Sequence, residues 1–420
     1  MPAFSRPEYK LWYNAFRPEQ VKFARAAAEN TRVAKLVFDL ASTCNMGCSY
    51  CFADRGRYGA RDTHAARVLS PEMAAAIVSK VLQQVNEVGH IKFFGGEPLL
   101  AIDAIGVVCS TTFAAADEGL LRRKPSFNVI TNGTLFTNKA ATVLRDYSIR
   151  MTISMDGPEA IHDAQRTFTN GRGTYKRICE NILKFSEFGC KLGVLEAVFT
   201  PKHLEFGYSM LDLFKALEDK FSQFFEIIVV HPLDQPTLDA LPSSDEKNMY
   251  TESMKEQAAT LYEYIMRGSL TTEKSSRLQY MLKSLTSAQH DENLCGVGFD
   301  TITIKPDGAV YACYVFSNNG DFRYGNILDD AFWVAFKSGG IGKAMASGSR
   351  FRHEACNECD IQSTCTHCLS GMTSSSGMNS QLPDVNCDFN IGQIEGFLSM
   401  IAQEHDSGRF DQLCQLMTRT

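Results

Sequence analysis

Several features are missing from this 420-residue sequence, and each absence argues against a class of protein. There is no excess of positive charge: 42 basic and 48 acidic side chains give a formal net charge of −6. Neither a duplex-sized basic surface nor an anionic-membrane binder is indicated. The first residues lack the apolar stretch of a signal peptide, and no uninterrupted apolar segment of bilayer length stands out. We therefore expect a cytoplasmic protein with no nucleic-acid or membrane partner.

The cysteines are unusually numerous and unusually grouped. Of the 14 in the chain, seven fall into tight C-x2-C or C-x3-C groups. In a reducing compartment this grouping indicates metal binding rather than disulfides. Four others show no ligand spacing and are predicted to be inert thiols: Cys109, Cys179, Cys190 and Cys414.

Cys44, Cys48 and Cys51 form a C-x3-C-x2-C triplet, which is one ligand short of closing a metal centre. A four-iron cluster held by three thiolates leaves one iron open to another molecule, so such a site can do chemistry as well as store electrons. Tetrahedral zinc would need a fourth protein ligand nearby, and the flanking residues offer no obvious candidate. The triplet therefore favours an open iron–sulfur centre over structural zinc.

Apolar, β-branched runs alternate with helical patterns, which is typical of a parallel sheet covered by helices. A helix is expected to begin at Pro71 with Ser70 as its N-cap. Periodicity alone leaves an open doubly wound sheet and a partial barrel as alternatives. Six strands are predicted, at residues 33–40, 90–94, 127–130, 150–154, 192–199 and 224–230.

Residues with chemical character follow the first four predicted strands. In both alternative folds, reactive groups belong at the C-terminal ends of the strands. Because four such placements coincide, we predict one site at this edge of the sheet. The segments are, in order, the cysteine triplet, Gly95-Gly96-Glu97-Pro98, Thr131-Asn132-Gly133 and Ser154-Met155-Asp156-Gly157.

The C-terminal part has a different character. A hairpin is predicted over residues 301–313, with Pro-Asp-Gly as its turn. The loop-rich segment beyond it has little apolar material and needs metal for stability; a pair of zinc knuckles using His353 or His367 is one alternative. The predicted domains are an N-terminal extension (1–32), a core (33–240), a helical linker (241–290), a cysteine-rich domain (291–390) and a C-terminal helix (391–420).

The triplet, with Tyr50 before its last cysteine and Gly-Gly-Glu-Pro downstream, resembles the radical S-adenosylmethionine (SAM) superfamily. In that family the open iron is chelated by the amino and carboxylate groups of SAM. An electron from the reduced cluster then splits the sulfonium and yields a 5'-deoxyadenosyl radical, which takes a hydrogen atom from the substrate. The resemblance implies an α/β fold, a partial (β/α)6 TIM-like barrel followed by a loop-rich iron–sulfur SPASM domain.

The resemblance also implies residue roles. Glu97 would accept a hydrogen bond from the SAM ammonium, and the fork of donors on Arg166 would suit its carboxylate. No catalytic residue is assigned beyond the cluster. The implied SAM contacts are Tyr50, Gly95, Gly96, Glu97, Thr131, Asn132, Ser154 and Arg166.

The C-terminal cysteines resemble the SPASM extension, with Cys365 and Cys368 separated by two residues where three are usual. Thr301 stands where some relatives have another cysteine, so the fourth ligand of the first auxiliary cluster is not identified. The resemblance implies three [4Fe-4S] clusters: Cys44, Cys48 and Cys51 would hold the SAM cluster, Cys295, Cys313 and Cys368 auxiliary cluster I, and Cys356, Cys359, Cys365 and Cys387 auxiliary cluster II.

Within the family, residues 51–59 and 93–99 look most like maturases that build thioether links in ribosomal peptides. The expected activity is that of an oxidoreductase-type peptide cyclase, which abstracts a hydrogen from a precursor peptide and forms a cysteine thioether or a C–C or C–O crosslink. Sulfatase-maturing relatives carry an aspartate at the position of Tyr314, which counts against formylglycine formation and leaves it as an alternative. A non-catalytic iron–sulfur electron carrier and a zinc-stabilised interaction protein are further alternatives.

The expected partners are a ribosomally synthesised precursor peptide and a flavodoxin- or ferredoxin-type electron donor. Many such cyclases grip the leader peptide with an N-terminal winged-helix module, but only 32 residues precede the first predicted strand. We therefore expect the leader to bind the polar helices before Cys295 or a separate leader-binding protein.

Overall fold

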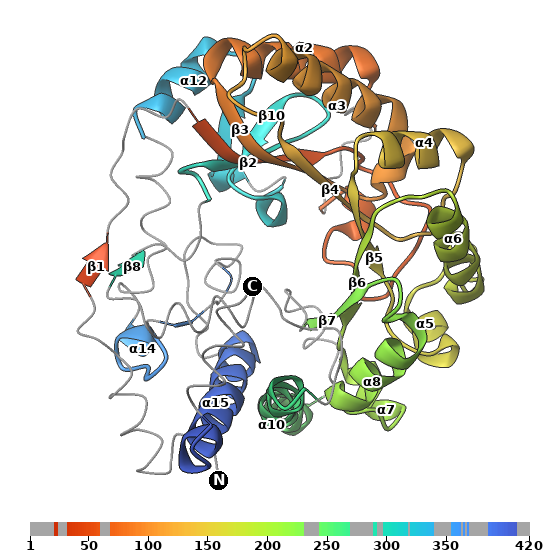
Figure 1. Ribbon diagram of the computed structural model, residues 1–420, viewed down its shortest axis with the longest axis vertical. Helices are drawn as coiled ribbons and strands as arrows, with labels where there is room; N and C mark the ends of the chain where they lie inside the picture. Colours follow the sequence, from red (N-terminus) through yellow and green to blue (C-terminus); the bar gives the residue numbers. More distant parts are fainter. Residues whose placement is uncertain are drawn as a thin grey trace. The chain divides into compact units, whose positions relative to one another are not determined.

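A computed structural model describes residues 21–23, 32–58, 68–230, 243–268, 289–291, 297–317, 320–339, 354–362, 364–365, 368 and 385–409. The chain divides into two compact units (Figure 1). The first, which we name the sheet unit, comprises Ala26–Ala197 and Gly296–Ser347. The second, the helical unit, comprises Met1–Arg25, Val198–Cys295 and Gly348–Thr420.

The sheet unit is built from parallel strands that pair in chain order and alternate with helices. This arrangement confirms the predicted α/β class. The strands are β2 (Arg32–Asp39), β3 (Glu87–Phe94), β4 (Ser126–Thr131), β5 (Arg150–Ser154) and β6 (Leu192–Val198). The intervening helices are η2 (Asp54–Gly56), α2 (Pro71–Gln84), η3 (Pro98–Ala101), α3 (Ile102–Asp117), α4 (Asn138–Asp146), α5 (Glu159–Gln165) and α6 (Tyr175–Glu187).

Helix α2 begins as the sequence predicts. Ser70 is extended, and its hydroxyl accepts a hydrogen bond from the Met73 backbone N–H at 3.2 Å. Pro71 occupies the first helical turn, where its missing N–H costs nothing. The N-cap and the proline together fix the start of the helix.

The two faces of the sheet differ in their side chains. On one face the rings of Phe93 and Phe127 stack with centroids 6.0 Å apart, and Phe113 of α3 lies 5.4 Å from Phe127. Figure 1 shows α2 and α3 over this part of the sheet. Because side chains alternate along a strand, Lys92 and Phe94 lie on the opposite face. That face carries polar and charged groups.

A hairpin extends the sheet beyond β2. Strands β9 (Thr301–Ile304) and β10 (Ala309–Tyr311) pair antiparallel, which confirms the predicted hairpin, and β9 pairs parallel with β2. Gly308 adopts φ +82° in the turn, a conformation that suits glycine. The following elements are η4 (Tyr314–Phe316), η5 (Gly320–Phe322), β11 (Arg323–Asn326), which pairs with β10, and α12 (Asp330–Lys337).

A buried ion pair joins this hairpin to β2. The Lys305 ammonium lies 2.9 Å from Asp39 Oδ2, and both side chains are almost fully buried. Burial raises the pKa of Asp39, while the positive charge of Lys305 opposes that shift. The Tyr58 ring lies 4.8 Å from the same ammonium. The start of the cysteine-rich region is therefore fixed to the core by charge as well as by strand pairing.

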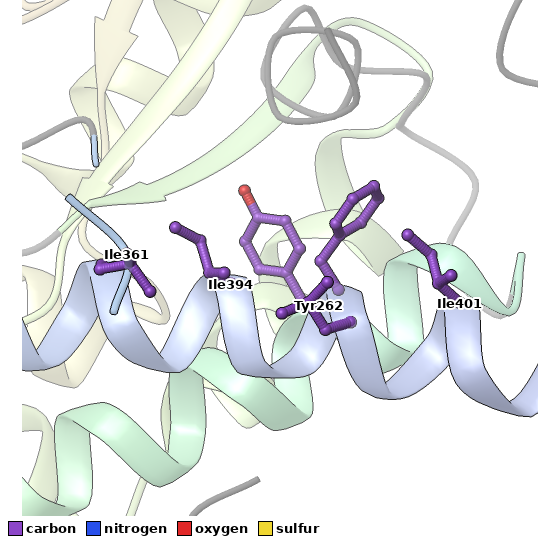
Figure 2. Packing of buried hydrophobic residues seen from close by; sticks show 6 residues of the cluster. Tyr262, Ile361, Ile394 and Ile401 are labelled. Carbon is purple, nitrogen blue, oxygen red and sulfur yellow. The ribbon is translucent and has the colours of Figure 1, made fainter. Parts of the chain in front are cut away.

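The helical unit is organised around α10 (Ser244–Met266) and α15 (Val385–Asp406). These helices approach closely at Gly392 and Gly396, where an added Cβ would lie 2.3 Å from Lys255 O and 2.4 Å from Ala259 O. Figure 2 shows the apolar cluster of Tyr262, Ile361, Ile394, Phe397, Leu398 and Ile401. The other described elements are β1 (Val21–Phe23), which pairs with β8 (Gln289–Asp291), α7 (Pro201–Glu205), α8 (Met210–Phe221), β7 (Glu226–Val230) and α14 (Glu354–Asn357).

One helical stretch of the described chain, Pro98–Asp117, is long and apolar enough to cross a membrane, with a mean hydropathy of 1.8. Asp103 interrupts this stretch, so it is not an uninterrupted apolar segment. In the fold it connects β3 to β4, and Ala104, Val108 and Cys109 are buried. A helix that covers a parallel sheet is also rich in apolar residues, because it buries one side against the strands. The apolar composition of this stretch therefore fits a helix that covers the sheet.

Candidate functional site

The cysteine loop follows β2 and lies against the end of β3. The Gly96 N–H donates to Ala41 O at 2.6 Å, and the Glu97 N–H donates to Thr43 O at 3.0 Å. A Cβ on Gly96 would lie 2.1 Å from Thr43 O and 2.5 Å from Arg55 O. The Gly-Gly-Glu-Pro segment therefore needs glycine because the chain's own cysteine loop packs against it, whatever else binds there.

The thiols of this loop receive N–H donors. The Met46 backbone N–H lies 3.4 Å from Cys44 Sγ, the Asn132 side-chain amide lies 3.5 Å from the same sulfur, and the Arg55 backbone N–H lies 3.3 Å from Cys51 Sγ. Burial, with a contribution from nearby Glu97, raises the pKa of Cys44 to about 12. A thiolate here needs positive charge beside it.

These observations test whether the loop suits the implied cluster. No group of three or more His, Cys, Asp or Glu side chains within the described ranges converges on the position of a single metal ion. All three thiols are half-buried. A four-iron cluster is larger than one ion, and its thiolate ligands accept N–H hydrogen bonds that help to set its potential. The residues of this loop fit such a group.

Glu97 joins the ends of β3 and β4. Its carboxylate is fully buried and accepts from the Thr131 hydroxyl at 2.7 Å, the Asn132 backbone N–H at 2.9 Å and the Leu99 backbone N–H at 3.0 Å. Burial raises the pKa of Glu97, and the bond from Asn132 is the largest effect in the opposite direction. This carboxylate therefore already accepts three hydrogen bonds from the protein, two on Oε1 and one on Oε2.

Asn132 connects β4 to the cysteine loop. Its amide N–H2 donates to Asn45 Oδ1 at 2.9 Å as well as toward Cys44, and its Oδ1 accepts from the Thr134 backbone N–H at 2.9 Å. The Asn45 amide in turn donates to the Thr134 hydroxyl at 2.8 Å, so Asn45, Asn132 and Thr134 form a closed ring of hydrogen bonds. Asn45 and Thr134 are positioning residues that the sequence did not reveal.

Tyr50, Asp156 and Arg166 form a compact polar group on the β5 side of the loop. The Tyr50 hydroxyl donates to Asp156 Oδ2 and accepts from Arg166 Nη1. Arg166 Nη1 also lies 3.7 Å from Asp156 Oδ1, and both side chains are buried. Burial raises the pKa of Cys48, and the positive charge of Arg166 is the main opposing influence. Arg166 Nε is buried without a hydrogen-bond partner among the described residues, so one donor of its fork is unused.

His162 holds the polar group of Tyr50, Asp156 and Arg166 in place through hydrogen bonds. Its Nδ1 accepts from the Asp156 backbone N–H at 3.2 Å, so its Nε2 carries the proton and donates to the Thr174 hydroxyl at 2.9 Å. That hydroxyl in turn donates to the Arg166 carbonyl at 2.6 Å. Burial lowers the pKa of His162 to about 4. A neutral, fully bonded histidine here has a structural role.

The cysteine loop is also held by backbone hydrogen bonds to the segment after α5. Residues 45–49 run beside residues 165–169, with Met46 and Phe168 forming an isolated antiparallel bridge. The loop thus contacts three neighbours: the ends of β3 and β4 and this segment. The hydrogen bonds are Gly47 N to Thr167 O (2.8 Å), Ser49 N to Gln165 O (2.9 Å) and Thr169 N to Asn45 O (3.3 Å).

Ser154 is the predicted residue that is not joined to this network. It ends β5, is half-buried and lies in register with Glu196 of β6. The other predicted SAM contacts, Tyr50, Gly95, Gly96, Glu97, Thr131, Asn132 and Arg166, all lie in the hydrogen-bonded surroundings of the cysteine loop. Their roles toward SAM stay predictions.

The C-terminal cysteines are divided between the units. Cys313 follows β10 in the sheet unit, and Cys295 lies outside the described residues. In the helical unit, the Cys359 N–H donates to Cys356 O at 3.2 Å, and Cys359 and Cys365 pack against the apolar cluster of α10 and α15. Cys368 is half-buried in the same unit, and Cys387 lies on α15 near its start. Their assignment to two auxiliary clusters stays a prediction.

Comparison with known proteins gives the family. Residues 40–204 match the family model of the radical SAM superfamily, and residues 295–368 match that of SPASM, an iron–sulfur cluster-binding domain. The chain belongs to the radical SAM superfamily, as an enzyme of the kind that carries a C-terminal SPASM domain. This result confirms the resemblance inferred from the cysteine motifs.

Two curated relatives match this chain over most of their own length. A cysteine-type anaerobic sulfatase-maturating enzyme of Clostridium perfringens is 26% identical over 346 residues, covering 77% of this chain and 85% of the relative. The subtilosin biosynthesis protein AlbA of Bacillus subtilis is 21% identical over 360 residues, covering 83% and 72%.

Solved structures share the fold. The AdoMet-bound structure of anSMEcpe has a TM-score of 0.67 at 20% identity and covers 91% of this chain and 98% of its own. Streptococcus suis SuiB, bound to its precursor peptide SuiA, has a TM-score of 0.56 at 15% identity, with 84% and 76% covered. At these identities the likeness shows the fold.

Proposed function

We propose that this protein is a radical SAM/SPASM peptide maturase. It would cleave SAM reductively, abstract a hydrogen atom from a ribosomally made precursor peptide and install an intramolecular crosslink, first of all a cysteine thioether. The observation that carries this proposal is the fit of the cysteine loop to an open cluster, at the strand ends where Glu97, Asn132 and Arg166 converge. The relatives add support, since SuiB was solved with a precursor peptide and AlbA is named for bacteriocin biosynthesis.

When bound, the iron–sulfur cluster would supply the electron that fragments SAM. The chain's own part is positioning. Arg166 has an unused buried Nε and would bind the SAM carboxylate through it, oriented by Tyr50 and Asp156. Glu97 retains acceptor capacity on the oxygen that takes a single protein donor, which suits an ammonium. Because Arg166 and Glu97 are buried, water would compete little with these contacts.

We further propose three [4Fe-4S] clusters, with the SAM cluster on Cys44, Cys48 and Cys51 and two auxiliary clusters on the C-terminal cysteines. A flavodoxin- or ferredoxin-type protein would supply the electrons. Anaerobic reconstitution of the full chain should then give about twelve irons and about twelve acid-labile sulfides per protein. Colourless protein without sulfide would reject this composition.

A second candidate function is formylglycine formation on a sulfatase. The extent of the match to the Clostridium perfringens enzyme favours it. Tyr314 counts against it, because this position would carry an aspartate in sulfatase-maturing relatives. A maturase that forms C–C or C–O crosslinks fits the same radical chemistry as the thioether proposal.

One experiment separates these possibilities. Dithionite-reduced holoenzyme should convert SAM to 5'-deoxyadenosine, measured by liquid chromatography. Mass spectrometry of a co-expressed neighbouring cysteine-containing peptide should show the loss of two hydrogens, which marks a crosslink. Formation of formylglycine would replace the proposal with the second candidate, and intact SAM would remove both.

A further inference from the structure

Lys92 stands on the polar face of β3, two residues before the end of the strand. It lies in register with Val37 of β2 and Asn128 of β4. The Gly95-Gly96-Glu97 segment that packs against the cysteine loop begins directly after Phe94. The mechanism proposed above gives Lys92 no role.

The surroundings of its ammonium are unusual. Lys92 Nζ lies 4.7 Å from the centroid of the Tyr314 ring and 5.6 Å from that of the Phe94 ring. These two rings are themselves only 4.2 Å apart. Within the described part of the chain, no hydrogen bond or ion pair reaches this ammonium. Two aromatic faces hold it on one side.

Among the described residues, no carboxylate lies within ion-pair distance of this ammonium, and the negative groups near it act from farther away. Burial lowers the pKa of Lys92, and Glu196 of β6 is the main influence in the opposite direction. Aromatic faces attract a cation, but they do not supply the oxygen acceptors that the N–H donors of an ammonium otherwise use. Other charged groups near Lys92 are Lys35, which repels it, and Cys313. A carboxylate within hydrogen-bond distance would complete the surroundings of the ammonium.

The position of the ring pair indicates where that anion would come from. Tyr314 directly follows Cys313, and Phe94 lies in register with Asp39 at the end of β2. The ammonium is thus on the polar face of the sheet and extends from β3, on the far side of β2, toward the hairpin that leads to Cys313. A peptide that reaches the SAM-binding edge of the sheet would pass this face.

We propose that Lys92 binds a carboxylate of the peptide substrate, with the Phe94 and Tyr314 rings as the platform that holds the ammonium. This inference rests on the proposed peptide maturase function and specifies its substrate class as an acidic peptide. The carboxylate belongs either to an acidic side chain or to the C-terminus, and both sources present the same group.

The test measures peptide binding without turnover. Full-length reconstituted protein, with SAM but no reductant, is dialysed against three matched sets of short, randomised, cysteine-containing peptides. The first set is amidated and has no acidic residue, the second is identical but has a free C-terminus, and the third is amidated with one glutamate. Mass spectrometry reports which peptides are retained. We expect at least about tenfold better retention of one acidic set than of the neutral set, the range of a charge-assisted hydrogen bond, and the preferred set identifies the source.

Variants locate the effect. Lys92→Met should abolish the preference for carboxylate, and Lys92→Arg should keep most of it. Lys124→Met is the matched control, because Lys124 also lies over an aromatic ring, Phe113, at 4.9 Å but is paired with Asp117 at the surface. This variant should bind like the wild type.

Two results would overturn the assignment: equal retention of all three sets by the wild type, or an unchanged preference in Lys92→Met. If Lys92→Met does not fold, the retention of the three peptide sets by the wild type still tests the assignment. Formation of 5'-deoxyadenosine by reduced wild-type protein is measured separately. If SAM is cleaved but carboxylate is not preferred, only the role of Lys92 fails; intact SAM would instead remove the proposed function.

Discussion

The two cysteine-rich regions of this protein are held in different ways. The loop of Cys44, Cys48 and Cys51 is fixed by hydrogen bonds to neighbouring parts of the sheet unit. The segment of Cys356, Cys359 and Cys365 has turns of its own and packs on an apolar helix pair through Ile361, Cys359 and Cys365. The first region is organised by polar contacts that exist without metal, and we expect the second to depend far more on what its cysteines bind.

This difference indicates that metal contributes differently to the shape of the two regions. A loop that must leave one ligand position open cannot rely on metal for its shape, because the metal contributes only three bonds to protein there. A fully ligated cluster can hold a short, weakly packed segment together, as structural metals do in small domains. The predictions below test the contrast.

The largest effect is expected from Cys44→Ala. Loss of one of three thiolates should remove the SAM cluster, about four irons per protein, and abolish formation of 5'-deoxyadenosine. Thermal unfolding of the sheet unit should change little, since its hydrogen bonds to the loop mostly use the backbone. Cys109→Ala is the control: this buried thiol of α3 has no ligand spacing, so iron content and activity should be retained. Equal iron in Cys44→Ala and wild type would contradict the assignment.

Removal of all iron should separate the two regions directly. In chelator-treated protein, hydrogen exchange measured by mass spectrometry should rise strongly in peptides covering residues 354–368. Peptides covering β2 to β5 should remain protected, because the parallel sheet and its buried ion pair do not depend on metal. A comparable loss of protection in both regions would show that the loop is not preorganised.

Gly96→Ala should distort the cysteine loop. The new methyl group would meet two backbone carbonyls, and backbone cannot move aside as a flexible side chain can. We expect a loss of stability of about 3 kcal/mol, at the upper end of overpacking, together with reduced iron loading. Gly106→Ala is the matched control, since its Cβ would meet only Val143 Cγ2 at 3.7 Å inside α3. That helix interior should gain up to about 1 kcal/mol.

The elements predicted correctly from the sequence are those whose structure depends on one local pattern. Residues 150–154 were predicted as a strand and match β5, because a short run with apolar and β-branched residues favours a strand locally. The Pro-Asp-Gly turn likewise fixed the hairpin. The C-terminal helix was expected from residue 391, whereas α15 begins at Val385 and includes Cys387, because the polar residues of its first turn hide the helical pattern.

The candidate site was predicted as a set of residues but not as a network. Motif positions indicated that Glu97, Asn132 and Arg166 would meet at one edge. Sequence could not show that Glu97 is already used by three protein donors, or that Tyr50 bridges Asp156 and Arg166. Apart from the bond between Leu99 and Glu97, these contacts join residues more than thirty positions apart and depend on tertiary packing, so no local pattern records them.

The smallest predicted effect concerns His162, which supports the Arg166 side of the loop. Its pKa is about 4 in the folded protein, below the ordinary value of 6.5, because the neutral ring is buried. The unfolded chain therefore binds the proton more readily, so the stabilisation is fully present above about pH 6.5 and is lost as pH falls toward 4. Between pH 7.5 and pH 5 this group alone should remove about 2 kcal/mol from the free energy of unfolding. Urea unfolding at both pH values should show that His162→Gln, which cannot titrate, lacks this part of the pH dependence while being less stable than the wild type at pH 7.5. An identical pH dependence in both proteins would mean that His162 has the same pKa in the folded and unfolded states, which would contradict its burial as a neutral ring.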